Sequence, residues 1–197
     1  LVGTFGVAAG GAPKICPPAD VVLPVPLPRE YVVFHAWSGG YKKHLKEWPN
    51  ANWVALTRRA LDAGLPVVFT GGRSDCERTM QLIGATGVDD GRLINAAGAL
   101  TLPETVEVLS RARVVASVCT GIMHLAAAVG ARVVSLHGPT SSKRWGAIGS
   151  GVVSVDAAQD GCGFLNLGFE DEGQRRDCMV SIPVEAVWAA LRQQLGD

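Results

Sequence analysis

The chain has 197 residues, 48% of them apolar, and its 18 basic side chains balance 18 acidic ones. This length and composition suffice for one full hydrophobic core, and no apolar run approaches the ~20 residues of a membrane-spanning helix. The zero formal net charge removes any general electrostatic argument for nucleic acid as a partner.

The amino-terminal 30 residues differ in composition from the rest of the chain. Small residues alternate there with prolines, and the chain starts at Leu1 without a charged leader and cleavage site. Because proline cannot continue a helix, residues 1–30 are predicted to be an extended linker, or the remnant of a preceding domain, with a short strand at 21–25. We therefore expect the chain to be a fragment whose folded domain covers residues 31–197.

From Tyr31 onward, strand and helix patterns alternate. Continuous β-branched runs predict buried strands at 31–36, 66–70, 93–95, 114–118, 133–136 and 152–155. Amphipathic or capped segments predict helices at 50–63, at 101–111 with a Thr101–Glu104 capping box, at 183–195, and from a Ser74 cap to about Ala85. Residues 37–49 and 162–177 are interpreted as exposed loops. This order predicts an α/β fold, a Rossmann-like doubly wound parallel sheet.

The chain is organised around residues 114–140, where a strand, a tight turn, a short helix and a second strand follow one another. The turn Cys119-Thr120-Gly121 opens the helix at the carboxyl end of a strand, where open parallel sheets bind ligands. Unpaired amides at a helix start suit an anion such as phosphate. Thr120 is either such a ligand residue or only a helix cap. His124, one turn later, either reaches the ligand or is a surface histidine.

Two further loops follow strands at the same predicted edge. The first carries Ser38, Lys46 and two lysines, Lys42 and Lys43, that are interpreted as solvated. The second carries Asp75, which either accepts hydrogen bonds from sugar hydroxyls or only complements a helix dipole. The sequence contains no G-x-G-x-x-G, no P-loop and no G-x-S-x-G, which argues against a typical NAD site, a P-loop NTPase and a serine hydrolase.

The cysteines give a separate indication. The five are odd in number and widely separated, and none forms a C-x-x-C pair: they are Cys16, Cys76, Cys119, Cys162 and Cys178. This pattern predicts free thiols in a reducing compartment rather than a disulfide framework. It also gives no support to a structural zinc site.

An ordered set of motifs resembles glycosyltransferase family nine, the heptosyltransferases. The segment S-V-C-T-G-I-M-H-L-A-A at 117–127 resembles that family's D-[TS]-G-x-x-H-L-x-A signature. Other segments resemble its remaining motifs in the same order: K-E-W-P at 46–49, F-T-G-G at 69–72 with Asp75, N-A-A-G at 95–98, H-G-P-T at 137–140 and C-M at 178–179. The resemblance covers residues 31–195, and the ordered set makes it specific.

The resemblance implies the carboxyl-terminal half of a two-domain GT-B enzyme. Such enzymes transfer a sugar, usually heptose, with inversion from a nucleotide diphosphate donor (ADP-heptose or similar) to a lipopolysaccharide-core or related glycan acceptor. It implies no metal and no cofactor, a cytoplasmic location peripheral to the inner membrane, and a general base in the missing N-terminal domain. The chain alone is therefore expected to be inactive. A non-catalytic nucleotide-sugar binding module is the alternative, and a different Rossmann enzyme is disfavoured by the missing glycine fingerprint.

The resemblance also implies residue roles. Ser38 and Lys46 would contact the diphosphate, Asp75 the ribose or base side, and Thr120, Gly121 and His124 the phosphate and sugar. Cys119 replaces the family's acidic residue, and a neutral thiol cannot accept strong hydrogen bonds from sugar hydroxyls. Either the helix start lowers the pKa of Cys119 and restores an anion, or Cys119 is a buried, inert packing residue.

Overall fold

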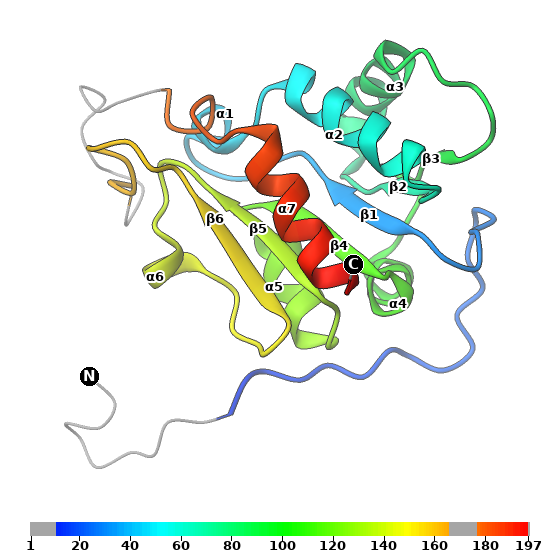
Figure 1. Cartoon of the computed structure of the whole chain (residues 1–197). Helices are drawn as coiled ribbons and strands as arrows, with labels where there is room; N and C mark the ends of the chain where they lie inside the picture. The colour runs from blue at the N-terminus through cyan, green and yellow to red at the C-terminus, as the bar shows by residue number, and fades with distance from the viewer. Residues whose placement is uncertain (1–10, 166–176, 197) are drawn as a thin grey trace.

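Six parallel strands form the sheet of the computed structural model, which describes residues 11–165 and 177–196 (Figure 1). They are β1 (Val32–His35), β2 (Val67–Phe69), β3 (Leu93–Asn95), β4 (Val114–Val118), β5 (Val133–His137) and β6 (Val152–Asp156). Their spatial order is β3-β2-β1-β4-β5-β6, so the chain winds outward from β1 and then returns to place β4 beside it. The strand order reverses between β1 and β4, which confirms the predicted doubly wound fold.

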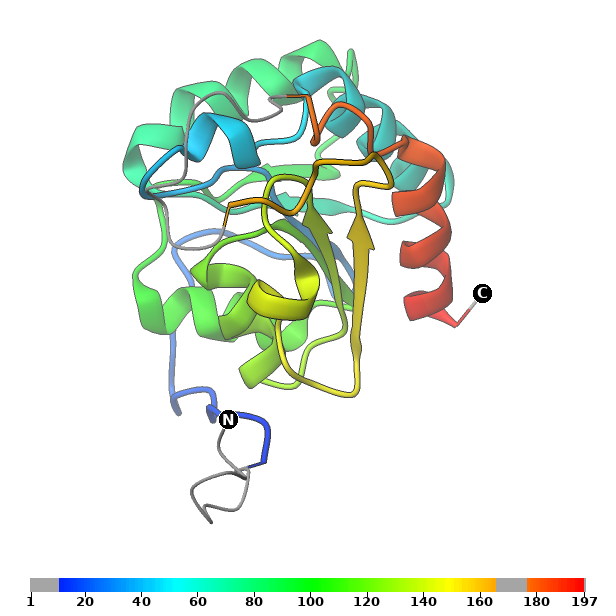
Figure 2. The same cartoon turned by 90° about the vertical axis from the view of Figure 1, so that its left-hand side faces the viewer.

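Helices cover both faces of this sheet (Figures 1 and 2). The longer ones are α2 (Asn50–Asp62), α3 (Cys76–Ala85), α4 (Leu102–Arg111), α5 (Gly121–Ala128) and α7 (Val184–Leu195). On one face α2, α3 and α7 bury side chains such as Trp53 against Phe34 of β1, with the two ring centroids 5.5 Å apart. On the other face α4 and α5 pack Val108 and Met123 against Val33. Successive side chains of β1 point to opposite faces of the sheet and thus contribute to both hydrophobic cores.

Local capping signals place several helix starts. The Thr101 hydroxyl accepts from the Glu104 N–H, and the Glu104 carboxylate accepts from the Thr101 N–H at 2.5 Å, which confirms the predicted capping box of α4. The prediction that Ser74 caps the next helix is wrong. Ser74 lies inside a 3-10 turn, η2 (Arg73–Asp75), and α3 begins after it. No helix in the described ranges is long and apolar enough to cross a membrane.

The prediction that residues 37–49 form an exposed loop is only partly right, since residues 39–41 are exposed and lie outside any helix or strand. This segment contains the short helix α1 (Lys43–Lys46), and Trp37, Lys42 and Trp48 are buried. Each indole is anchored to a distant element: Trp37 Nε1 donates to Thr79 Oγ1 at 2.8 Å, and Trp48 Nε1 donates to a backbone carbonyl of the segment before α7 at 3.0 Å. The two tryptophans are separated by polar residues with no helical or strand period, so their burial depends on tertiary contacts.

Residues 11–30 extend along the outside of the domain without forming the strand predicted at 21–25 (Figure 1). The surrounding prolines lack the N–H groups that a strand ladder requires. Instead, Leu23, Val25 and Leu27 pack against the face that carries α4 and α5, and the Ile15 N–H donates to the Ala128 carbonyl at 2.8 Å. The part of the predicted linker at 1–10 lies outside the described residues.

The prediction that all cysteines are free is wrong. Cys162 and Cys178 form a disulfide, with their Cα atoms 5.7 Å apart, whereas Cys16, Cys76 and Cys119 are free thiols. The fold brings the segment after β6 beside the segment before α7, and counting cysteines cannot reveal that approach. Residues 166–176, most of the loop predicted at 162–177, lie outside the described residues.

The G-P-T turn at 138–140 packs against the segment that carries Cys178. A Cβ at Gly138 would lie 2.9 Å from the backbone nitrogen of Met179 and 2.6 Å from its sulfur. Only glycine therefore allows this close approach. The two motifs at 137–140 and 178–179 are thus one packed unit in space.

Candidate functional site

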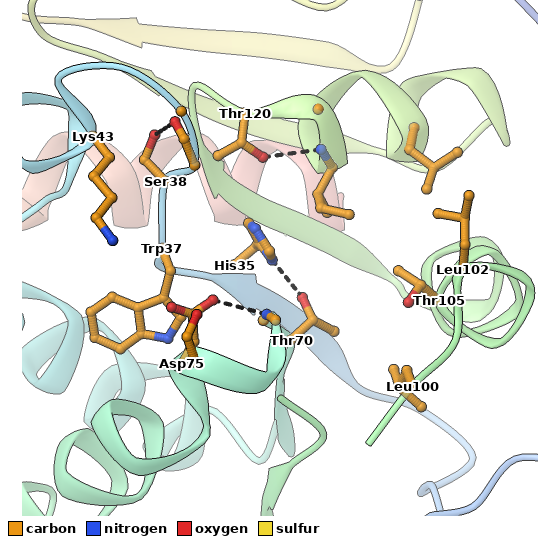
Figure 3. A pocket seen from close by; sticks show the side chains of 18 residues that line it. His35, Trp37, Ser38, Lys43, Thr70, Asp75, Leu100, Leu102, Thr105 and Thr120 are labelled. Atoms are coloured by element: carbon orange, nitrogen blue, oxygen red, sulfur yellow. Dashed lines mark hydrogen bonds between the residues drawn. The ribbon is translucent and has the colours of Figure 1, made fainter. Parts of the chain in front are cut away.

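A hollow lies at the carboxyl ends of the parallel strands, where the strand order reverses between β1 and β4 (Figure 3). Its volume is about 740 Å³. Its walls come from the segments that follow β1, β2, β3 and β4, and we call it the crevice. Ligands of open α/β sheets bind at such a reversal, because the two neighbouring connections leave on opposite faces of the sheet.

The two ends of the crevice differ in chemistry (Figure 3). Hydroxyl, ammonium and backbone amide groups line the end between the β1 loop and α5, including those of Ser38, Lys43, Thr120 and Gly121. Apolar side chains line the opposite end, including Leu100 and Leu102. A ligand with an anionic part and a flat apolar part would match both ends.

The start of α5 faces the polar end. The Thr120 hydroxyl accepts from the Ile122 N–H at 3.0 Å, so Thr120 is the helix cap and also lines the crevice. Gly121 is the first helical residue and is exposed there. Amides in a first helical turn have no intrahelical acceptor, and the positive end of the helix dipole adds to their attraction for an anion.

The segment after β1 presents two lysines in different places. Lys43 lines the crevice, and its ammonium group points into it (Figure 3). Lys46, the lysine singled out by the sequence, does not line the crevice, and its Nζ donates to the Gly39 carbonyl at 3.0 Å. Its charge still acts on the buried Cys119 thiol. Gly39 itself lines the crevice, so Lys46 lies one carbonyl behind the surface that a ligand would meet.

Asp75 lies on the wall opposite α5. Its Oδ2 accepts from the Gly72 N–H at 2.8 Å, and its other oxygen lies 3.9 Å from an Arg78 guanidinium nitrogen. A Cβ at Gly71 would approach the Asp75 Cβ to 3.0 Å and the Trp37 ring to 3.1 Å, so a larger residue there would require these side chains to shift. The carboxylate keeps acceptor capacity for a hydroxyl of a ligand.

Two residues from the sequence motif do not line the crevice. Cys119 is 9% exposed and packs in the core beside Met123. Burial raises the pKa of its thiol, and the Thr140 hydroxyl and the Lys46 charge only oppose that rise. Of the two alternatives for Cys119, the lowered pKa is therefore wrong, because desolvation is the largest influence on this thiol. Placing Cys119 in the core fits its role as a packing residue.

His124 lines a neighbouring apolar hollow of about 300 Å³, together with Ile15 and Ile148. The two hollows share Gly121 and Leu125, so they adjoin along α5, and His124 lines only the second of them. His124 therefore does not line the crevice, although it lies one helical turn after Thr120.

Sequence reasoning missed His35, which lies at the last position of β1 and lines the crevice. Its Nδ1 lies 2.9 Å from Thr70 Oγ1, and burial lowers the pKa of the imidazole to about 4 despite the opposing Asp75 charge. The imidazole is therefore neutral at neutral pH. The available signal was position: a polar side chain ending a buried strand faces the ligand edge of a parallel sheet.

Across residues 11–165 and 177–196, no group of three histidine, cysteine or carboxylate side chains could hold a metal ion. The chemistry that the crevice supplies is thus hydrogen bonding from amides and hydroxyls, positive charge from a lysine, and an apolar end.

Comparison with protein families gives a match of residues 8–163 to Glycosyltransferase family 9 (heptosyltransferase). Lipopolysaccharide heptosyltransferase 1 of Pseudomonas aeruginosa is 34% identical over 126 residues, 64% of this chain and 33% of that protein. Lipopolysaccharide heptosyltransferase 2 of Escherichia coli is 29% identical over 97 residues, 49% of this chain and 28% of that protein.

Solved structures share the fold. A family 9 glycosyltransferase from Veillonella parvula has a TM-score of 0.70 at 18% identity, covering 84% of this chain and 46% of that one. An E. coli heptosyltransferase solved with ADP has a TM-score of 0.64 at 22% identity, covering 84% and 44%. The chain thus spans less than half the length of each of these relatives.

Proposed function

The chain belongs to glycosyltransferase family 9, the heptosyltransferases, and on that premise we propose that it forms the donor-binding half of such an enzyme. The crevice would hold a nucleoside diphosphate sugar. The observation that carries this proposal is the pairing of a helix start and Lys43 at one end of the crevice with an apolar end opposite. Diphosphate and nucleobase have those two characters.

Each part of the donor then has a partner. The diphosphate lies against the amides at Thr120 and Gly121, with Ser38 and Lys43 on its other side. Asp75 accepts a hydrogen bond from a sugar or ribose hydroxyl. ADP is the nucleotide of choice for a first test, because one relative is solved with ADP and another is named an ADP-heptose heptosyltransferase.

The same groups would assist the reaction. When the glycosidic bond to the donor breaks, negative charge develops on the departing diphosphate. Amides of a helix start and an ammonium group fixed beside that position stabilise the charge as it forms. An acceptor domain preceding this chain would supply the general base, and inversion at the sugar carbon follows if the acceptor attacks from the opposite side.

We place the enzyme at the cytoplasmic surface of the membrane that carries a glycolipid acceptor. Trp145 and Ile148 are exposed beside Lys143 and Arg144 in and after α6 (Ser142–Trp145). Basic and aromatic side chains suit an anionic bilayer surface. We expect the chain to float with vesicles that contain phosphatidylglycerol more than with pure phosphatidylcholine. Equal flotation would contradict this location.

The proposal is tested by calorimetry with ADP, UDP, CDP and GDP, followed by a transfer assay. We expect the chain to bind one nucleoside diphosphate but to transfer no sugar to a glycolipid, because the proposed base lies in another domain. No binding to any of the four would contradict the donor site. Rapid transfer by this chain alone would contradict the proposal that the general base lies in another domain.

A non-catalytic binding module is the second candidate, and Cys119 favours it, since the family's acidic residue is absent there. A longer polypeptide that includes the preceding domain separates the two. Sugar transfer by that polypeptide supports the enzyme, and donor binding without transfer supports the module.

Lys46→Ala tests the lysine that lies behind the crevice surface. We expect a less than about tenfold loss of affinity for ADP, smaller than the roughly 1.5–3 kcal/mol of a direct charged hydrogen bond, because the ammonium group donates to Gly39 and does not line the crevice. Lys43→Ala is the matched variant, and calorimetry compares the two. An unchanged affinity in Lys46→Ala would show that Lys46 does not interact with the diphosphate and would leave that role to Lys43.

A further inference from the structure

Arg78, on α3, contacts three groups around the crevice without lining it. Its guanidinium donates to both carboxylate oxygens of Glu47, at 2.6 and 3.2 Å. The same guanidinium lies over the Trp37 ring, 4.0 Å from the centroid, and 3.9 Å from the Asp75 carboxylate. One side chain thus joins α3 to both ends of the segment between β1 and α2.

Glu47 also binds the start of the same segment. Its Oε1 accepts from the Ser38 N–H at 3.3 Å. Ser38 and Lys43, which line the crevice, therefore lie between two points that Arg78 holds: Trp37 on one side and Glu47 on the other. Figure 3 shows Trp37, Ser38 and Lys43 along one wall.

The geometry needs arginine in particular. A planar guanidinium can donate to two carboxylate oxygens while its face rests on an indole, and an ammonium group cannot do both. Because the Arg78 side chain is 39% exposed, the ion pair itself adds little to the stability of the fold. Its effect is on the position of the segment.

We propose that Arg78 is a positioning residue for donor binding: its contacts with Glu47 and Trp37 hold the β1–α1 segment so that Ser38 and Lys43 face the diphosphate. This inference rests on the proposed function. It extends that function to a residue that does not touch the donor. The apolar end of the crevice, formed by other segments, does not depend on Arg78.

The test compares ADP with AMP, which lacks the second phosphate, in the parent chain and in Arg78→Lys. Arg78→Lys is expected to bind ADP about five- to tenfold more weakly, AMP with nearly the parent affinity, and to melt within about 3 °C of the parent. Glu47→Gln keeps the acceptor for Ser38 and one acceptor for Arg78, so an intermediate loss for ADP is expected.

Arg59→Lys is the matched control, since Arg59 pairs with Glu185 at 2.5 Å and neither residue lines the crevice. It should leave both affinities unchanged. Equal losses for ADP and AMP in Arg78→Lys, or no loss for either, would overturn the inference while ADP binding by the parent still supports the proposed function. A parent chain that binds no ADP would overturn both.

Discussion

Replacing Gly121 with alanine is expected to stabilise the chain and to weaken its binding of ADP in the same variant. Gly121 is the first residue of α5, and a Cβ there would meet no protein atom within 4 Å. Alanine is favoured over glycine in a helix by roughly 0.5–1 kcal/mol, so the melting temperature should rise. The new methyl group would project into the crevice that Gly121 lines.

The loss of affinity follows from where the diphosphate is proposed to lie. A methyl group over the first amides of α5 keeps a phosphate oxygen from approaching to hydrogen-bond distance. Losing one charge-assisted hydrogen bond costs about 1.5–3 kcal/mol, which is roughly a 10- to 100-fold weaker affinity for ADP. Calorimetry and thermal unfolding on the same preparation measure both quantities.

Gly84→Ala is the matched control. Gly84 lies in α3, a Cβ there also meets nothing within 4 Å, and it does not line the crevice. It should raise the melting temperature without changing the affinity for ADP. Parent-like ADP binding by Gly121→Ala would remove the start of α5 from the phosphate site.

Local patterns were sufficient to predict the architecture. The continuous β-branched run at 114–118 became β4, buried throughout, and the Thr101–Glu104 pair caps α4 as its spacing predicts. The position of Thr120 followed in the same way, because a cap residue between a buried strand and a helix must lie at the ligand edge of a parallel sheet. Such features depend on neighbours within a few residues.

The features that were missed depend on distant contacts. The buried Trp37 donates a hydrogen bond to Thr79, which is 42 residues away in the sequence. The Cys162–Cys178 disulfide joins the segments on either side of a long loop. Which lysine faces the crevice is decided by the rotation of α1, a helix of four residues whose pattern is too short to read. Cys119 matches a motif position but lies in the core, since a thiol is more easily buried than the carboxylate it replaces.

His35 shows most clearly how burial changes the chemistry of a crevice residue. In the folded chain its pKa is lowered to about 4, from 6.5 in an unfolded chain, and desolvation is the main cause. Between these two values the unfolded chain binds more protons than the folded one. The stability that this neutral histidine contributes is therefore complete above pH 6.5 and is lost as the pH falls toward 4.

We expect the free energy of unfolding to fall over that window by up to about 3 kcal/mol through His35, from a shift of roughly two to three pKa units. His137, another buried histidine with a pKa lowered by burial, adds to the loss in the parent chain. His35→Asn keeps a polar group near Thr70 but cannot titrate, so its stability should depend less on pH than the parent's. Urea unfolding at pH 7.0, 5.5 and 4.5 measures the difference.

The exposed His44 on α1 provides the control, because His44→Asn should leave the parent's pH dependence in place. If His35→Asn and the parent lost the same stability between pH 7 and 4.5, the pKa of His35 would be the same in the folded and unfolded chains, and the imidazole would be charged below about pH 6.5. A charged imidazole would then face the crevice beside Asp75, and ADP would meet a cation at the end of β1. The neutral ring instead leaves Lys43 as the positive group that lines the crevice near the proposed diphosphate, so the same titration also decides how the crevice attracts its ligand.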